Sequence, residues 1–199
     1  MQLSKVNLAT ALLAFSSLPS SMATRVPIAA RQAAEQPQYL GLGRRDCQIT
    51  VDETHPALDV ASCTALIAAG RSAFTPAELN GVRTFHGDFG SLPYIYTPGA
   101  APPACLIRVT SERFENRTKD MSIGDVLYGA EELLKACGTQ NGGSAGLGGD
   151  APPPGSGLIF VTYWNVEVKG FYQGDIEGDG VHPSAITPEG KAALPPVNP

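Results

Sequence analysis

His86 and Asp88, in the stretch "TFHGDFG", place a histidine two residues from a carboxylate. Such a pair can serve as the general base for a serine nucleophile, as in a hydrolase. A base also needs a nucleophile and an orienting group at hand, and we assign no residue of this sequence to either role. We therefore interpret His86 as a loop histidine and expect no catalytic residue in this chain.

The acids of "GDIEGDG" (Gly174 to Gly180) match the opening of a calcium-binding loop of the EF-hand type. That loop requires an acid at its twelfth position, which is Ile186 when counted from Asp175. We therefore interpret Asp175, Glu177 and Asp179 as a solvated acidic turn. Zinc is not expected either, because the histidines are scattered and none lies near a cysteine: His55, His86 and His182. No metal or other cofactor is predicted.

Three further patterns could carry chemistry, and each has a simpler structural interpretation. Glu131 and Glu132 are adjacent, so on a helix they point in different directions and form a solvated face. The glycine-rich stretch from Gly138 to Gly157 lacks the lysine of a phosphate-binding loop. A cluster of aromatic residues could line a ligand site, but aromatic side chains serve mainly as core. We expect these residues to pack onto a sheet: Phe74, Phe85, Phe89, Tyr94 and Tyr96.

The amino terminus has the three parts of a secretory signal peptide. Lys5 supplies the positive charge, "LATALLAFSSL" the apolar run, and Ser21 and Ala23 the small residues of a cleavage site. The apolar run is shorter than the roughly 20 residues that cross a membrane. We therefore predict a signal peptide over residues 1–23, a secreted protein and no membrane span.

Residues 24–45 contain few large apolar side chains and end at the basic pair Arg44-Arg45. A basic pair in a flexible segment resembles a kexin-type processing site. We predict a propeptide or flexible linker, with the mature chain starting at Asp46. Its removal takes five of the 14 basic and one of the 19 acidic residues, which leaves a net charge near −9. Such a charge argues against nucleic acid or an anionic membrane as partner.

All four cysteines follow the basic pair: Cys47, Cys63, Cys105 and Cys137. An even number of cysteines in an exported chain predicts two disulfides, with three possible pairings. The sequon Asn116-Arg117-Thr118 is a further sign of the secretory route and predicts a glycoprotein.

Periodicity and capping residues predict the elements of one domain over residues 46–172. Asp59 can cap a helix that Gly70 ends, and Ser122 can cap a second helix that Gly138 ends. Runs of β-branched and aromatic residues predict strands at 47–51, 92–97, 105–111 and 158–172. Residues 173–199 show no period and are predicted to be a disordered tail.

The element order β-α-β-β-α-β predicts an α+β fold, a two-layer sandwich with ferredoxin-like order. Cys63 lies on the apolar stripe of the first helix, and Cys105 begins a strand beneath that helix. We therefore favour the pairs Cys63–Cys105 and Cys47–Cys137. The other two pairings stay open, because sequence carries no information on connectivity.

Several stretches resemble a group of small, cysteine-stapled secreted fungal proteins. They are "SCTALIAAG", "CLIRVTS", "MSIGDVLYGAEELLKACG", the pair Gly142-Gly143 and "GLIFVTYWNVEV". The group comprises fungal effectors and killer-toxin-like proteins, including the necrosis-inducing extracellular effector family. The resemblance covers about Cys47 to Val168 and lies in cysteine placement and element order. It implies secretion and action on a host or a competing microbe, and it carries over no catalytic residue.

Together these features predict a secreted, non-enzymatic effector or toxin-like virulence protein. It would act through its folded surface on an unknown extracellular or host protein target. The alternative is a small extracellular hydrolase, whose signature would be a pocket that joins His86 and Asp88 to a serine.

Overall fold

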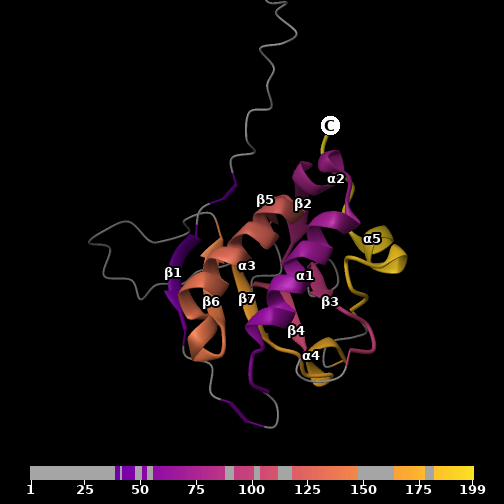
Figure 1. Cartoon of the computed structure of the whole chain (residues 1–199). Coiled ribbons are helices and arrows are strands. Elements are labelled where there is room, and N and C mark those ends of the chain that lie inside the picture. Colours follow the sequence, from indigo (N-terminus) through magenta and orange to yellow (C-terminus); the bar gives the residue numbers. More distant parts are fainter. Residues whose placement is uncertain are drawn as a thin grey trace, which may run out of the picture. The chain divides into compact units, whose positions relative to one another are not determined.

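A helix layer covers one face of an antiparallel sheet, so the fold is α+β (Figure 1). The computed structural model describes residues 39–40, 42–47, 51–52, 56–87, 92–100, 104–111, 118–147, 164–177 and 182–199. All of them belong to one compact unit of the chain.

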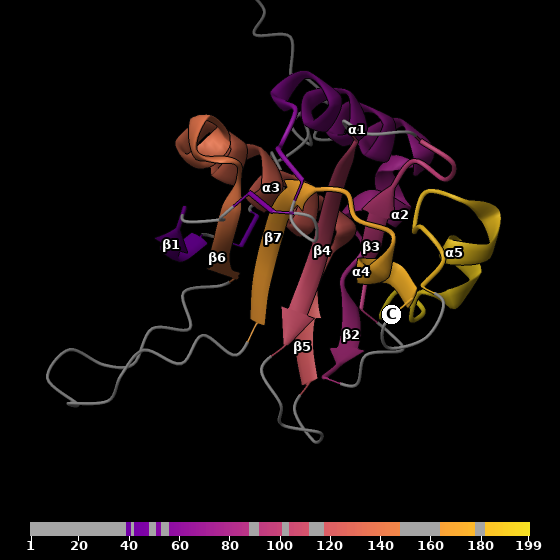
Figure 2. The same cartoon turned by 90° about the horizontal axis from the view of Figure 1, so that it is seen from below.

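The two predicted helices are present with the predicted N-caps, and Gly138 ends the second as predicted. Gly70 does not end the first helix but lies inside it, where a Cβ would lie 2.8 Å from Leu127 Cδ2 of the other helix. Helix α1 (Val60–Ala73) begins where the Asp59 carboxylate accepts hydrogen bonds from the amides of Ala61 and Ser62. Helix α3 (Ile123–Cys137) begins with a capping box, in which Ser122 and Asp125 each accept the other's backbone N–H. The two helices lie side by side over the sheet (Figure 1, Figure 2).

The main sheet has five strands in the order β1-β6-β7-β4-β3, and every neighbouring pair is antiparallel. Their bounds are β1 (Leu42–Asp46), β3 (Tyr94–Tyr96), β4 (Cys105–Ser111), β6 (Gly143–Leu147) and β7 (Trp164–Gly170). A separate antiparallel pair joins β2 (Arg83–His86) to β5 (Thr118–Met121). The remaining elements are short: α2 (Pro76–Asn80), the 3-10 helix η2 (Gly138–Gln140), α4 (Gly174–Glu177) and α5 (Pro188–Ala193).

The core lies between the helices and the inner face of the sheet. Alternate residues of the central strands point inward and are fully buried, among them Ile107, Val109, Val166 and Val168. Two disulfides reinforce this layer. Cys63–Cys105 ties α1 to β4, and Cys47–Cys137 ties the residue after β1 to the end of α3. These are the pairs that the element order favoured.

The ferredoxin-like order is not confirmed. A strand was predicted at 47–51, but Cys47 and Val51 lie outside strands, and residues 48–50 are outside the described residues. The first strand is instead β1, and β6 lies between it and β7. Strand β6 has the sequence GSAGL, whose small residues the sequence pattern assigned to a loop. These residues pair with strands on both sides, and that pairing is not visible in local composition.

The predicted disordered tail is corrected by the structure, in which residues 182–199 pack against β2, β3 and α1 (Figure 2). The Ala185 amide donates to the Tyr94 carbonyl oxygen at 2.7 Å, and the Asn198 amide donates to the Val82 carbonyl oxygen at 2.8 Å. Composition alone failed here because the segment is held by backbone hydrogen bonds and by small buried residues, such as Ala185 and Gly190, rather than by an apolar stripe.

The packed unit therefore extends beyond the predicted boundaries of 46–172 at both ends. Strand β1 includes residues 42–45, which were assigned to the propeptide or linker. The basic pair Arg44-Arg45 therefore lies in a strand that pairs with β6 and not in a flexible segment. The predicted signal peptide, residues 1–23, lies outside the described residues.

Candidate functional site

A row of five polar residues crosses the outer face of the main sheet, one from each strand. Cross-strand pairing places Tyr94 opposite Arg108, Arg108 opposite Glu167, Glu167 opposite Ser144, and Ser144 opposite Asp46. Directly opposed residues of antiparallel strands project to the same face. Helices α1 and α3 cover the other face, so the row lies on the face of the sheet away from them.

Charged side chains at the centre of the row neutralise one another. The Arg108 guanidinium forms ion pairs with Glu167 and with Asp175 of α4. The Lys169 ammonium lies 3.0 Å from the same Asp175 oxygen, and its side chain is only 2 % exposed. Two cations and two anions thus form one neutral cluster, which joins β4 and β7 to α4. A buried cation without such a partner would be strongly destabilising.

The cluster fixes the charge state of Arg108. Burial opposes the charged form, but the carboxylates of Glu167 and Asp175 outweigh burial and raise the pKa of the guanidinium above its usual value. An arginine held in this way is a permanent cation that positions the two carboxylates. The arrangement can bind polar groups by hydrogen bonding, and its four charged side chains are paired with one another.

One serine pattern was not recognised from the sequence. Gly142 to Gly146 reads G-x-S-x-G, the pattern of a nucleophile elbow, with Ser144 at its centre. An elbow places its serine on a sharp turn from a strand into a helix. Ser144 lies instead within β6, after helix α3, and its neighbours in the row are the carboxylates of Asp46 and Glu167.

The glycines of this pattern have a structural role. Gly142 has a positive φ of 91°, and a Cβ there would lie 2.0 Å from the Val168 carbonyl oxygen. They therefore allow the turn from α3 into β6 and the close pairing of β6 with its neighbours. The G-x-S-x-G pattern here forms a tight turn into strand β6 and not a nucleophile elbow.

His86 lies at the exposed end of β2, opposite Thr118 of β5. Asp88, its predicted partner, lies outside the described residues. Ser111, at the end of β4, donates its hydroxyl proton to the Gly87 carbonyl oxygen at 2.8 Å. The pairing of His86 with Asp88 stays a prediction.

Each of the other candidate residues either has a structural role or lies outside the described residues. His182 stacks on Tyr94 with ring centroids 4.3 Å apart, and Asp175 belongs to the ion-pair cluster. Four of the five clustered aromatic residues are buried: Phe74, Phe85, Tyr94 and Tyr96. Outside the described residues lie Ala23, His55, Asp88, Phe89, Asn116 and Asp179. Within the described residues, no group of three or more His, Cys, Asp or Glu side chains could hold a metal ion.

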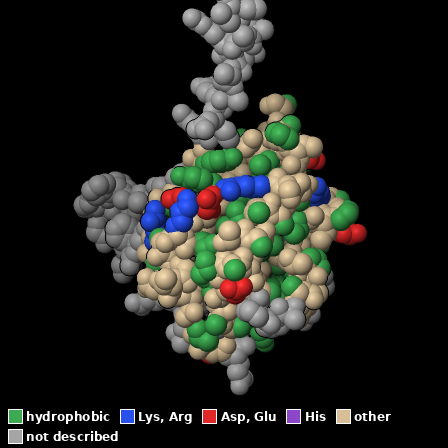
Figure 3. All heavy atoms as spheres, in the orientation of Figure 1, with side chains coloured by type: hydrophobic (Ala, Val, Ile, Leu, Met, Phe, Trp, Pro, Cys, Tyr) green, Lys and Arg blue, Asp and Glu red, His purple; other side chains and the backbone are tan. Residues whose placement is uncertain are grey.

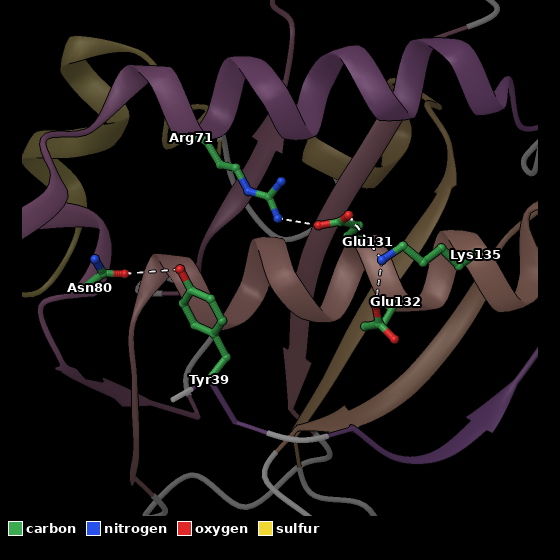
Figure 4. Close-up of polar contacts among 6 residues, drawn as sticks. All are labelled: Tyr39, Arg71, Asn80, Glu131, Glu132 and Lys135. Atoms are coloured by element: carbon green, nitrogen blue, oxygen red, sulfur yellow. Dashed lines mark hydrogen bonds and ion pairs between the residues drawn. The ribbon is translucent and has the colours of Figure 1, made fainter. Parts of the chain in front are cut away.

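Glu131 and Glu132 form an ion network on the helical face (Figure 4). Glu131 pairs with Arg71 of α1 and with Lys135, and Lys135 also pairs with Glu132 at 2.8 Å. Figure 3 shows acidic and basic side chains adjacent to each other across this face, with hydrophobic side chains around them. Glu131 therefore bridges the two helices, whereas Glu132 pairs within α3, and the two glutamates do not form a facing acid pair.

Among the helices that the structure describes, none has both the length and the apolar character needed to cross a membrane. Comparison of this chain with protein-family models, with curated proteins and with solved structures gives no match.

Proposed function

We propose that this protein is exported and acts as a disulfide-stabilised effector or toxin-like binding protein. It would engage a protein target of a host or a competing microbe through its folded surface. The observation that carries the proposal is that the polar residues brought together on the sheet form a neutral, mutually paired cluster around Arg108 and Lys169. Two disulfides support an oxidising compartment, which fits export.

Purified protein should be applied to candidate competitor microbes and to host tissue, in oxidised form and after reduction and alkylation. Growth inhibition or cell death would be scored against dose. The oxidised form should be active, and the reduced form should lose activity because the domain unfolds. Equal activity of the two forms would contradict a function that depends on the folded surface.

The hydrolase alternative is tested with His86→Ala. If the surface carries the function, this variant should keep activity within a few-fold of the parent. A loss of about 100-fold or more, with unchanged circular dichroism and melting temperature, is the size expected for a general base. That result would favour the hydrolase.

Processing after Arg45 belongs to the same proposal. Secreted protein should begin at Asp46, and N-terminal sequencing of the culture filtrate measures this directly. A start at Thr24 would show that the basic pair is retained.

A further inference from the structure

Residues 39–40 and 42–46 lie along the first half of α3 and the edge of β6. The Tyr39 ring stacks on Tyr128, with centroids 5.1 Å apart, and its hydroxyl donates to Asn80 Oδ1 at 3.3 Å (Figure 4). The Leu40 amide donates to Asp125 Oδ1 at 2.6 Å. The segment is therefore held by one aromatic contact and by directed hydrogen bonds before the strand begins.

Strand β1 then pairs with the edge of the sheet. Leu42 lies opposite Leu147 of β6 and packs against the core, and Arg45 lies opposite Ala145. Strand β6 has β7 on its other side, and among the described strands β1 is the one that covers its outer edge. An uncovered edge strand presents unpaired N–H and C=O groups to any extended chain of suitable sequence.

Two glycines of α3 shape the surface that receives this segment. A Cβ on Gly124 would lie 2.6 Å from Tyr39 Cε1, and a Cβ on Gly129 would lie 3.2 Å from Leu42 Cδ2. Glycine is unfavourable inside a helix relative to alanine. Gly124 therefore leaves room for the aromatic ring of Tyr39. Gly129 leaves room for the side chain of Leu42, which follows Tyr39 by three residues.

The basic pair Arg44-Arg45 lies at the end of this segment, and Arg45 is exposed. Cleavage after Arg45 breaks the covalent link between Tyr39–Arg45 and the domain. Cys47 stays attached to the end of α3 through its disulfide with Cys137. The freed segment loses the high effective concentration that tethering gave it, so it can dissociate and expose the edge of β6.

We propose that the edge of β6 and the adjoining surface of α3 form a binding site for an extended peptide, which Tyr39–Arg45 occupies until cleavage. The partner is an extended protein segment with an aromatic residue and, three residues later, a leucine-sized aliphatic residue. It adds a strand to the sheet, and its ring stacks on Tyr128. This inference rests on the processing step of the proposed function and gives the folded surface a definite contact site.

The test uses uncut protein, secreted from cells that lack the kexin-type protease, and the same protein cut by that purified protease. The probe is a fluorescent peptide with the sequence QYLGLGRR, residues 38–45, and the control peptide carries serine in place of Tyr39 and Leu42. Fluorescence anisotropy should show that the cut protein binds the probe at least tenfold more tightly than the uncut protein does. The control peptide should bind at least tenfold more weakly than the probe.

Matched variants test the proposed contact. Tyr128→Ala should weaken probe binding roughly fivefold, because it removes the ring on which Tyr39 stacks. Tyr172→Ala changes an exposed tyrosine after β7 and should leave binding unchanged. Each variant's melting temperature and near-ultraviolet circular dichroism show whether it is folded.

Three results would overturn the proposal. They are equal binding by cut and uncut protein, no binding by folded cut protein, and resistance of the folded protein to the protease. Biological activity is measured separately, so an active protein that binds no probe would refute this site and leave the proposed function in place.

Discussion

The Ser184 hydroxyl satisfies both backbone groups of Tyr96: its Oγ lies 2.6 Å from the Tyr96 carbonyl oxygen and 3.0 Å from the Tyr96 amide nitrogen. Tyr96 belongs to β3, the strand at one edge of the main sheet. One side chain of the C-terminal segment therefore replaces the missing neighbour strand at this position. This contact closes an edge that would otherwise present open hydrogen-bonding groups.

Ser184→Ala should lower the free energy of unfolding by about 1–3 kcal/mol, because it leaves a buried amide and a buried carbonyl without their partner. Ser72→Ala is the matched control, since Ser72 is exposed on α1, and it should change stability by less than about 0.5 kcal/mol. Urea unfolding followed by circular dichroism measures both. Equal effects of the two variants would mean that the C-terminal segment does not stabilise β3.

A second prediction concerns alkaline stability. Burial raises the pKa of the Tyr96 phenol above its usual value of 10. The folded state therefore keeps this proton more firmly than the unfolded state does. The associated stability is complete below pH 10 and is lost as the pH rises from there through the pKa of the folded state. The free energy of unfolding should fall over this range.

Tyr96→Phe should flatten that decline, because the titrating group is gone, and should itself cost about 1 kcal/mol at pH 7 by leaving the His182 carbonyl oxygen without its donor. Tyr172→Phe, at an exposed position, should leave the pH dependence as in the parent. If the parent, Tyr96→Phe and Tyr172→Phe all showed the same fall in unfolding free energy with pH, groups other than the Tyr96 phenol would be its cause.

The third prediction concerns the disulfides. Cys63→Ser should cost roughly 2–5 kcal/mol, because it removes a bridge that joins residues 42 apart in sequence. Peptide mapping without reduction should recover Cys63 linked to Cys105 and Cys47 linked to Cys137. A peptide that joins Cys47 to Cys63 would refute this connectivity.

The ion network between α1 and α3 gives a prediction for acid. Hydrogen bonds from Arg71 and Lys135 hold the pKa of Glu131 below its usual value. The stability from this pairing is therefore present above the ordinary glutamate range and is lost as the pH falls through the lowered pKa. Glu131→Gln should cost about 0.5 kcal/mol at pH 7 and almost nothing near pH 2.

Glu189→Gln, at an exposed position on α5, serves as the control for that measurement. Its effect on the unfolding free energy should be smaller at pH 7. High salt should reduce the effect of Glu131→Gln, because exposed ion pairs are screened. An effect that is unchanged in 1 M salt would indicate a role in packing.

Elements whose own residues carry the signal could be predicted from the sequence. The apolar period and the caps Asp59 and Ser122 define α1 and α3, and "CLIRVTS" coincides with β4. Four of the clustered aromatic residues were correctly assigned to packing: Phe74, Phe85, Tyr94 and Tyr96. Each of these features depends on interactions within one helix turn or one strand, so a local pattern is sufficient.

Other elements had a local signal that was not used. Thr75-Pro76 with Glu78 forms the capping box of α2. Thr187 followed by Pro188 caps α5, with a glycine in place of the capping-box acid. Strands β1 and β6 have no such signal. Their glycines, serine and arginines become strands because distant partners supply the hydrogen bonds, and the ion-pair cluster of Arg108 likewise depends on the register of β4 with β7.

Both disulfides close within residues 47–137, while β7 and all that follows it contain no cysteine. A single cut between Cys137 and Trp164 would therefore divide the chain into two pieces with no covalent bond between them. The smaller piece would carry β7, which lies between β4 and β6 and forms ladders with both. Separately produced, the two pieces should reassociate into the sheet by strand insertion, so this fold can serve as a split protein whose halves report on each other's proximity.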